Sequence, residues 1–120
     1  PANAGDPDYL LLKDYAGRAV RLTRDTLIHH LSGKYINQGR QNLLELVPEI
    51  LENPDEVYLN RVGKVQNEYE LRFIKFYQGY PVYVPVNVSL TVPSYIQTWH
   101  TLDTEVDGRR GGILLTKTRP

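Results

Sequence analysis

The chain has 120 residues, of which 41% are hydrophobic, enough for one compact domain with a single core and too few for two. It has no cysteine, which excludes disulfide staples and a thiolate nucleophile or metal ligand. The formal net charge of zero argues against a domain that holds nucleic acid by bulk charge alone, although residues 16–44 are predominantly basic. No apolar run approaches the ~20 residues of a membrane span, so no membrane partner is expected.

The chain opens on turn formers without apolar periodicity, and residues 1–15 are expected to be a linker-like segment. Methionine is absent from the whole sequence, including position 1. We therefore expect this chain to be part of a longer protein, with a single domain over residues 16–120.

The first predicted helix begins after Thr23, a residue type favoured at helix N-caps, and ends near Gly33, a residue type that commonly stops helices. Three apolar residues recur at helical spacing and are expected to form its buried face: Leu27, Ile28 and Leu31. With about 100° of rotation per residue, His29 then points nearly opposite to this face, and His30 lies on its flank.

A second amphipathic pattern covers residues 43–51, where Pro48 fits best as the first residue of a short helical turn. After Pro54 the residue types and their alternation predict strands in five segments: residues 57–59, 69–77, 82–88, 95–101 and 113–118. Short turns at residues 78–81 and 107–112 indicate antiparallel neighbours. The order predicts an α+β domain with N-terminal helices packed on a four- to five-stranded antiparallel sheet.

Residues 82–88 alternate valine with other residues, so the valines should bury one face against the helices while the other side stays open. Pro85 within this segment suits an edge strand or a bulge.

In the preceding strand, Ile74 and Phe76 alternate with Lys75 and Tyr77. If the two apolar residues face the helices, Lys75 and Tyr77 face outward.

The adjacent histidines are the first candidates for chemistry. Imidazole titrates near neutral pH, so His29 or His30 can take a proton from a ribose hydroxyl without extreme tuning. As a metal site the pair is poor, because neighbouring helical positions diverge and no acidic or cysteine ligand lies at useful spacing. Two polar residues on the outside of a packing helix would give the same pattern.

Three further candidates lie on predicted strands. Lys75, with Arg72, can stabilise charge on a phosphate, but lysines also protect sheet edges from aggregation. Thr98 and His100 share a face of their strand, while Trp99 points to the core. Thr98 can hydrogen-bond a phosphate oxygen and His100 can act as an acid or base, although threonine is also simply common in strands.

In sequence order, five segments resemble the Barnase, EndoU, colicin and RelE-like ribonuclease fold, in its phage and polymorphic-toxin branches: "VRLTRDTLIHH", "VPEILENPDEVYLN", "ELRFIKFY", "YIQTWHT" and "GGILLT". The resemblance implies that His29 is the helix histidine, Lys75 the strand cation and Thr98 the strand hydroxyl. Lys34 and Tyr35 stand where relatives often have Arg-His, which leaves His30 or His100 for a second histidine role.

The resemblance implies metal-independent RNA cleavage without a cofactor. A base deprotonates the ribose 2′-hydroxyl, which attacks the adjacent phosphate, and an acid protonates the leaving 5′-oxygen. Catalytic candidates are His29, Lys75, Thr98, His30 and His100. Substrate-binding candidates are Lys34, Tyr35, Arg40, Arg72 and Tyr77.

The resemblance also implies a biological context. Such domains are C-terminal toxin effectors of larger proteins in bacterial competition, including contact-dependent inhibition, or in phage biology. They are secreted or delivered as part of the parent protein, act in the target-cell cytoplasm, often on tRNA, and are neutralised by a cognate immunity protein. The alternatives are a non-catalytic structural domain and an RNA-binding module of a phage or secreted protein.

Overall fold

Strand pairing organises the molecule. The computed structural model describes residues 8–32, 39–62, 68–89, 93–103 and 106–117. Its elements are β1 (Tyr9–Lys13), β2 (Ala19–Thr23), α1 (Arg24–His30), α2 (Arg40–Leu43), the 3-10 turn η3 (Leu44–Leu46), α3 (Val47–Glu52), β3 (Glu56–Arg61), β4 (Glu68–Tyr77), β5 (Tyr80–Ser89), β6 (Tyr95–Ile96), β7 (His100–Thr101), the 3-10 turn η4 (Asp107–Arg109) and β8 (Ile113–Lys117).

The α+β class is confirmed, but the sheet is larger than the four to five strands expected. It has eight strands in the order β1-β2-β6-β5-β4-β3-β8, with β7 paired to β5 off this path. The β2–β6 pair is parallel, so the sheet is mixed. The extra strands come from the N-terminal β1–β2 hairpin and from the splitting of residues 95–101 into two short strands.

The expectation of a linker over residues 1–15 is wrong for its second half, because β1 pairs antiparallel with β2 from Tyr9 to Lys13. Asp14 closes the hairpin: its Oδ1 accepts hydrogen bonds from the backbone N–H groups of Ala16 and Arg18 at 3.0 and 2.9 Å. Gly17 adopts φ 80° in this turn, a left-handed conformation that favours glycine. Residues 1–7 lie outside the described part of the chain.

The N-cap of α1 is confirmed, since the Thr23 side chain accepts a hydrogen bond from the backbone N–H of Thr26. The expected buried face is confirmed for Leu27 and Leu31, which pack against the core, and wrong for Ile28. Ile28 is 58% exposed, whereas Thr26 and His30, one turn apart, are buried. Both buried polar side chains have hydrogen-bond partners: His30 Nδ1 bonds the Thr26 carbonyl, and the Thr26 hydroxyl accepts from Thr23 Oγ1 and donates to the Ile96 carbonyl. Gly33, the expected stop, lies outside the described residues.

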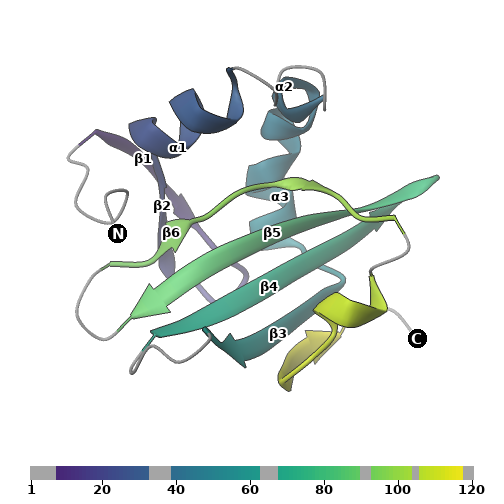
Figure 1. Ribbon diagram of the computed structural model, residues 1–120. Helices are drawn as coiled ribbons and strands as arrows, with labels where there is room; N and C mark the ends of the chain where they lie inside the picture. Colours follow the sequence, from purple (N-terminus) through teal and green to yellow (C-terminus); the bar gives the residue numbers. More distant parts are fainter. Residues whose placement is uncertain (1–7, 33–38, 63–67, 90–92, 104–105, 118–120) are drawn as a thin grey trace.

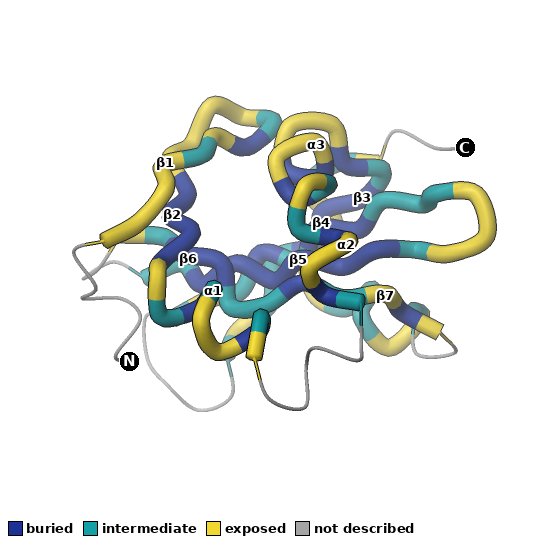
Figure 2. The backbone as a smooth tube through the Cα atoms, turned by 90° about the horizontal axis from the view of Figure 1, so that it is seen from above, coloured by how far each residue is buried: buried dark blue, intermediate teal, exposed yellow. Residues whose placement is uncertain are grey.

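The helix-facing core contains the apolar residues of α3 and the valines of β5, as expected: Val47, Ile50, Leu51, Val82, Val84 and Val86 are all fully buried. In Figure 1, α3 lies behind the β3–β5 part of the sheet and η4 lies in front of it, while β8 continues the sheet beside β3. Figure 2 shows the buried residues gathered in the central strands, whereas β1 is largely exposed.

The face assignment in β4 is wrong. Phe73 and Tyr77 belong to the helix-facing core, and Ile74 and Phe76 pack on the opposite side with Tyr83. That second face is not open either, because Leu102 and other residues of the C-terminal part cover it. Since β4 is buried on both sides, apolar residues occur at odd and even positions alike. Their alternation therefore does not indicate which face of β4 is turned to the helices. No described helix has the length and apolarity to cross a membrane.

Candidate active site

The two helix histidines occupy different environments. His29 is exposed and His30 is only 7% exposed. Their rings meet edge to face, with centroids 4.8 Å apart and planes at 87°. Helical geometry therefore separates the pair, as predicted, but it is the flank residue His30 that enters the core.

His30 is held in one tautomer. Its Nδ1 lies 2.9 Å from the carbonyl oxygen of Thr26, and because a carbonyl only accepts, Nδ1 carries the proton. In the neutral ring Nε2 is then the basic nitrogen. Burial lowers the pKa of His30 below its ordinary value of 6.5, and the positive charges of Arg40, His29 and His100 lower it further, against the hydrogen bond to Thr26. His30 is therefore neutral at pH 7.

Arg40 and Thr98, predicted separately, are in direct contact. Arg40 is 7% exposed and its Nη1 donates to Thr98 Oγ1 at 2.6 Å. The indole Nε1 of Trp99 donates to the Arg40 carbonyl at 2.7 Å, and the Trp99 ring lies 5.4 Å from that of His30. The first residue of α2 is thus fixed to the chain around Trp99, with a guanidinium group near the buried histidine.

Pro85 explains why Thr98 can reach Arg40. Strand β5 pairs with β6 at Val86 and Asn87 and with β7 at Val82 and Tyr83, and the ladder is interrupted between them. The Pro85 carbonyl accepts from the Gln97 N–H at 2.9 Å, so its nitrogen faces the same way but has no hydrogen to donate. Residues 97–99 therefore leave strand geometry, whereas a continuous strand over residues 95–101 was expected. The proline occupies a break in the pairing, although β5 is a central strand.

His100 connects the helix histidines to the second face of the sheet. Its Nδ1 donates to the Thr101 carbonyl at 2.8 Å, which leaves Nε2 as its basic nitrogen. Its ring contacts that of Tyr83 edge to face at 5.4 Å. Because the charge of His100 also acts on His30, the structure brings together His29, His30, Arg40, Thr98 and His100. We call these five residues the histidine cluster.

Tyr83 sits within a polar network that the sequence did not reveal. Its hydroxyl donates to Glu70 Oε1 at 3.0 Å, and Arg72 Nε donates to the same oxygen at 2.7 Å. The Arg109 guanidinium lies over the Tyr83 ring, 5.3 Å from its centroid. Burial raises the pKa of the Tyr83 hydroxyl, and the carboxylate of Glu70 raises it further. Arg72, a predicted substrate contact, thus lies on the second face of the sheet beside Tyr83, the ring that contacts His100.

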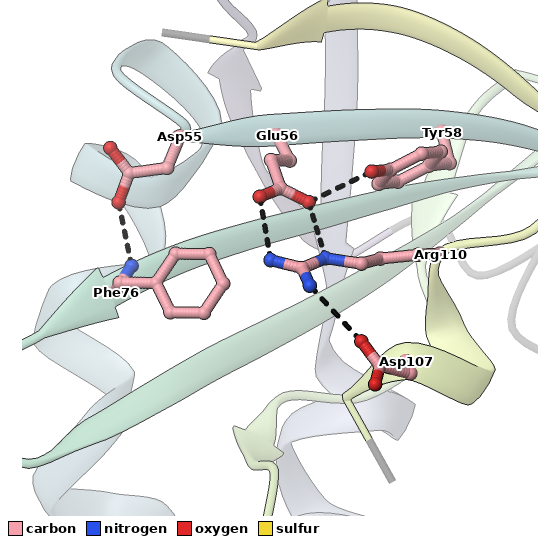
Figure 3. Close-up of polar contacts among 6 residues, drawn as sticks. All are labelled: Asp55, Glu56, Tyr58, Phe76, Asp107 and Arg110. Carbon is pink, nitrogen blue, oxygen red and sulfur yellow. Dashed lines mark hydrogen bonds and ion pairs between the residues drawn. The ribbon is translucent and has the colours of Figure 1, made fainter. Parts of the chain in front are cut away.

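A partly buried ion pair fixes the segment that carries Arg109 (Figure 3). Arg110 donates from Nε and Nη2 to the two carboxylate oxygens of Glu56 at 2.7 and 2.8 Å, and its Nη1 donates to Asp107. Tyr58 donates to Glu56 Oε1 at 2.9 Å. Burial alone would raise the Glu56 pKa, but the hydrogen bonds from Arg110 and Tyr58 hold it below 4.5.

Lys75 and Tyr77 are placed elsewhere. The Lys75 ammonium donates to the Asn53 carbonyl at the end of α3, at 2.7 Å. It lines a cavity of about 270 Å³ with Tyr15, Glu52, Asn53, Pro54 and Thr116, none of which belongs to the histidine cluster. Tyr77 stacks on Tyr80 with centroids 6.0 Å apart, and burial with the nearby Glu49 raises its pKa to about 12. A role for either residue in the reaction remains a prediction.

Lys34 and Tyr35, two predicted substrate contacts, lie outside the described residues. The contacts that the sequence missed are those of Glu70 and Arg109. The charges at these positions are visible in the sequence, but their approach to Tyr83 depends on tertiary structure. Among the described residues no group of three or more histidine or carboxylate side chains is arranged to hold a metal ion.

A family model described as phage-Barnase-EndoU-ColicinE5/D-RelE like nuclease2 matches residues 2–117 of the chain. No curated protein and no solved structure gives a significant match. The family match covers all five residues of the histidine cluster, as well as Tyr83 and Arg109.

Proposed function

Because the chain belongs to the phage Barnase-EndoU-ColicinE5/D-RelE-like nuclease 2 family, we propose that it is an endoribonuclease that cleaves RNA by metal-independent acid–base chemistry. The family match confirms the resemblance found in the sequence. What carries the proposal for mechanism is the histidine cluster, in which three imidazoles, a buried arginine and a hydroxyl come from three separate chain segments.

Proton transfer is assigned to the accessible imidazoles. His29 is exposed and His100 is half-buried with its Nε2 as the basic nitrogen. One of them removes the proton of the ribose 2′-hydroxyl, whose oxygen then bonds to phosphorus. The other protonates the 5′-oxygen as the P–O5′ bond breaks, which leaves a 2′,3′-cyclic phosphate. His30, neutral and fixed by Thr26, positions the ring of His29.

Charge on the phosphate is stabilised by Arg40 and Thr98. A guanidinium group in a largely buried position interacts with a phosphate more strongly than one in water, because the surrounding dielectric is lower. Thr98 holds the group in place and offers its own hydroxyl. The proposal does not depend on Lys75.

One assay tests this mechanism. Total RNA is incubated with the protein in excess chelator, and the wild type is compared with His29→Ala. Ile28→Ala is the matched control, since it removes an exposed neighbour on the same helix. We expect chelator-resistant cleavage by the wild type and by Ile28→Ala, and its loss in His29→Ala. No cleavage over a wide protein excess would contradict the enzyme and favour a structural or RNA-binding domain.

We further propose that the domain is the toxin effector of a larger secreted or phage protein, active in the cytoplasm of the target cell, with tRNA as its RNA class and an immunity protein as its partner. The nuclease family supports this role. Induced expression in a bacterium should arrest growth, and His29→Ala should remove the effect. Rescue by a product of the neighbouring gene would identify the inhibitor, and sequencing of RNA ends would reveal whether tRNA is cut. Normal growth at full expression would contradict the toxin role.

A further inference from the structure

We propose that Arg109, stacked on Tyr83 beside His100, binds a phosphate of the RNA next to the one that is cleaved. This inference rests on the proposed ribonuclease function, and it extends the substrate path from the histidine cluster to the second face of the sheet. Arg109 is not among the residues that the sequence suggested.

Arg109 and Arg110 are consecutive in sequence but differ in their pairing. Arg110 is saturated by two carboxylates, those of Glu56 and Asp107. Arg109 has no carboxylate partner within the described part of the chain, and its buried Nε makes no hydrogen bond there. Its guanidinium group lies over the face of the Tyr83 ring. A half-buried guanidinium group with unused donors favours an anion.

The surroundings of Arg109 are cationic. Both Arg72 and Arg109 lie close enough to the Tyr83 hydroxyl for their charges to oppose the rise in its pKa. Within this network Glu70 supplies one carboxylate, which is shared by Arg72 and Tyr83. One negative charge thus stands against two guanidinium groups, and the excess is positive.

The position of Arg109 relative to the proposed chemistry is fixed by Tyr83. This ring contacts His100 on one edge and carries Arg109 over its face, with centroid distances of 5.4 and 5.3 Å. The Arg110–Glu56 pair holds η4 against the sheet, so Arg109 does not need to be ordered when RNA binds (Figure 3). A backbone phosphate adjacent to the reacting one is the anionic group that an RNA bound across His100 would present there.

The test measures RNA binding without cleavage. A short, fluorescent, single-stranded 2′-O-methyl RNA of random sequence cannot undergo 2′-hydroxyl attack, and its affinity is measured by anisotropy over a series of salt concentrations. Arg109→Met keeps the stem that packs on Tyr83 and removes the charge. Lys13→Met removes the same charge from the exposed strand β1 and serves as the matched control.

We expect Arg109→Met to weaken binding about tenfold. The slope of log affinity against log salt should fall in magnitude by about 0.7, the value for one phosphate contact on a single strand. Lys13→Met should match the wild type, and thermal unfolding of both variants should be unchanged. A wild-type slope in Arg109→Met, or an equal loss in Lys13→Met, would overturn the inference.

The same proteins are assayed for cleavage of natural RNA, so the two proposals fail separately. Cleavage by the wild type with unaltered binding by Arg109→Met would contradict the phosphate site at Arg109 and support the ribonuclease function. Arg109-dependent binding without any cleavage would contradict the ribonuclease function and support the phosphate site at Arg109. Absence of salt-dependent binding by the wild type would overturn the phosphate site whatever the cleavage result.

Discussion

The guanidinium group of Arg40 donates to the hydroxyl of Thr98 at 2.6 Å across 58 residues of sequence. This contact joins the start of α2 to the interrupted strand segment beside β5. Arg40 is buried, so the hydroxyl contributes to satisfying a desolvated charge as well as to the proposed phosphate site. Under the proposed mechanism, stability and activity therefore depend on the same hydrogen bond.

Thr98→Val should lower the free energy of unfolding by about 1–3 kcal/mol, because it removes an acceptor from a buried charged donor while keeping the side-chain shape. It should also slow RNA cleavage at temperatures where the variant remains folded. Urea unfolding and initial cleavage rates measure the two effects. Thr98→Ser keeps the hydroxyl and is the matched control; equal losses in both variants would show that the hydrogen bond is not responsible.

The lowered pKa of His30 makes stability depend on pH. Its folded-state pKa lies below the ordinary 6.5, so the unfolded chain binds the proton more tightly. The free energy of unfolding should be highest above pH 6.5 and should decrease as the pH falls through 6.5 toward the folded-state pKa. Urea unfolding at a series of pH values measures this slope.

His30→Asn should reduce that slope, because asparagine can donate to the Thr26 carbonyl without titrating. The same change at the exposed His29 should leave it in place. A slope that survives in His30→Asn would assign the pH dependence to another group.

Glu56→Gln should destabilise the fold by about 2–4 kcal/mol, since it removes the largely buried carboxylate of the pair and leaves Arg110 with only the exposed Asp107 as a charged partner. The Glu56 side chain is only 2% exposed, whereas that of Asp107 is 88% exposed. Asp107→Asn is therefore the control and should stay within about 0.5 kcal/mol of the wild type. Chemical denaturation at neutral pH gives both values, and similar stabilities for the two variants would contradict the structural role of this pair.

Lys75→Met tests whether Lys75 has the catalytic role that the family resemblance implies or the structural role that its contact indicates. The ammonium donates to the carbonyl of Asn53 at the C-terminal end of α3. We expect the variant to lose about 0.5–1.5 kcal/mol of stability and to retain RNA cleavage within a few-fold. A loss of about a hundredfold in cleavage with unchanged stability would instead give Lys75 the catalytic role that the resemblance implies. Lys13→Met controls for the loss of one positive charge.

Local patterns predicted the elements that local chemistry determines. Thr23 caps α1 and Pro48 lies in the first turn of α3, because each residue type suits that position whatever surrounds it. The β4–β5 hairpin was predicted from the two strand patterns that flank Gln78 and Gly79. The φ angle of Gly79 is 92°, a value that suits glycine in a turn. The valine face of β5 was correct because its alternation was uninterrupted.

Predictions failed where tertiary contacts reverse a local preference. On α1 the polar Thr26 and His30 are buried and Ile28 is exposed, an arrangement that depends on Trp99 and Arg40 lying beside the helix. The candidate histidines could be chosen from their residue type. The contact of Thr98 with Arg40 could not, since no spacing rule relates positions so far apart.

Pro85 gives the sheet a place where the site can vary independently of the fold. The pairs on either side of it keep β6 and β7 in register with β5, so the order of the strands does not depend on the side chains at positions 97 and 98. One missing amide hydrogen thereby leaves, between two paired strands, a short stretch of chain that carries a side chain of the proposed phosphate site.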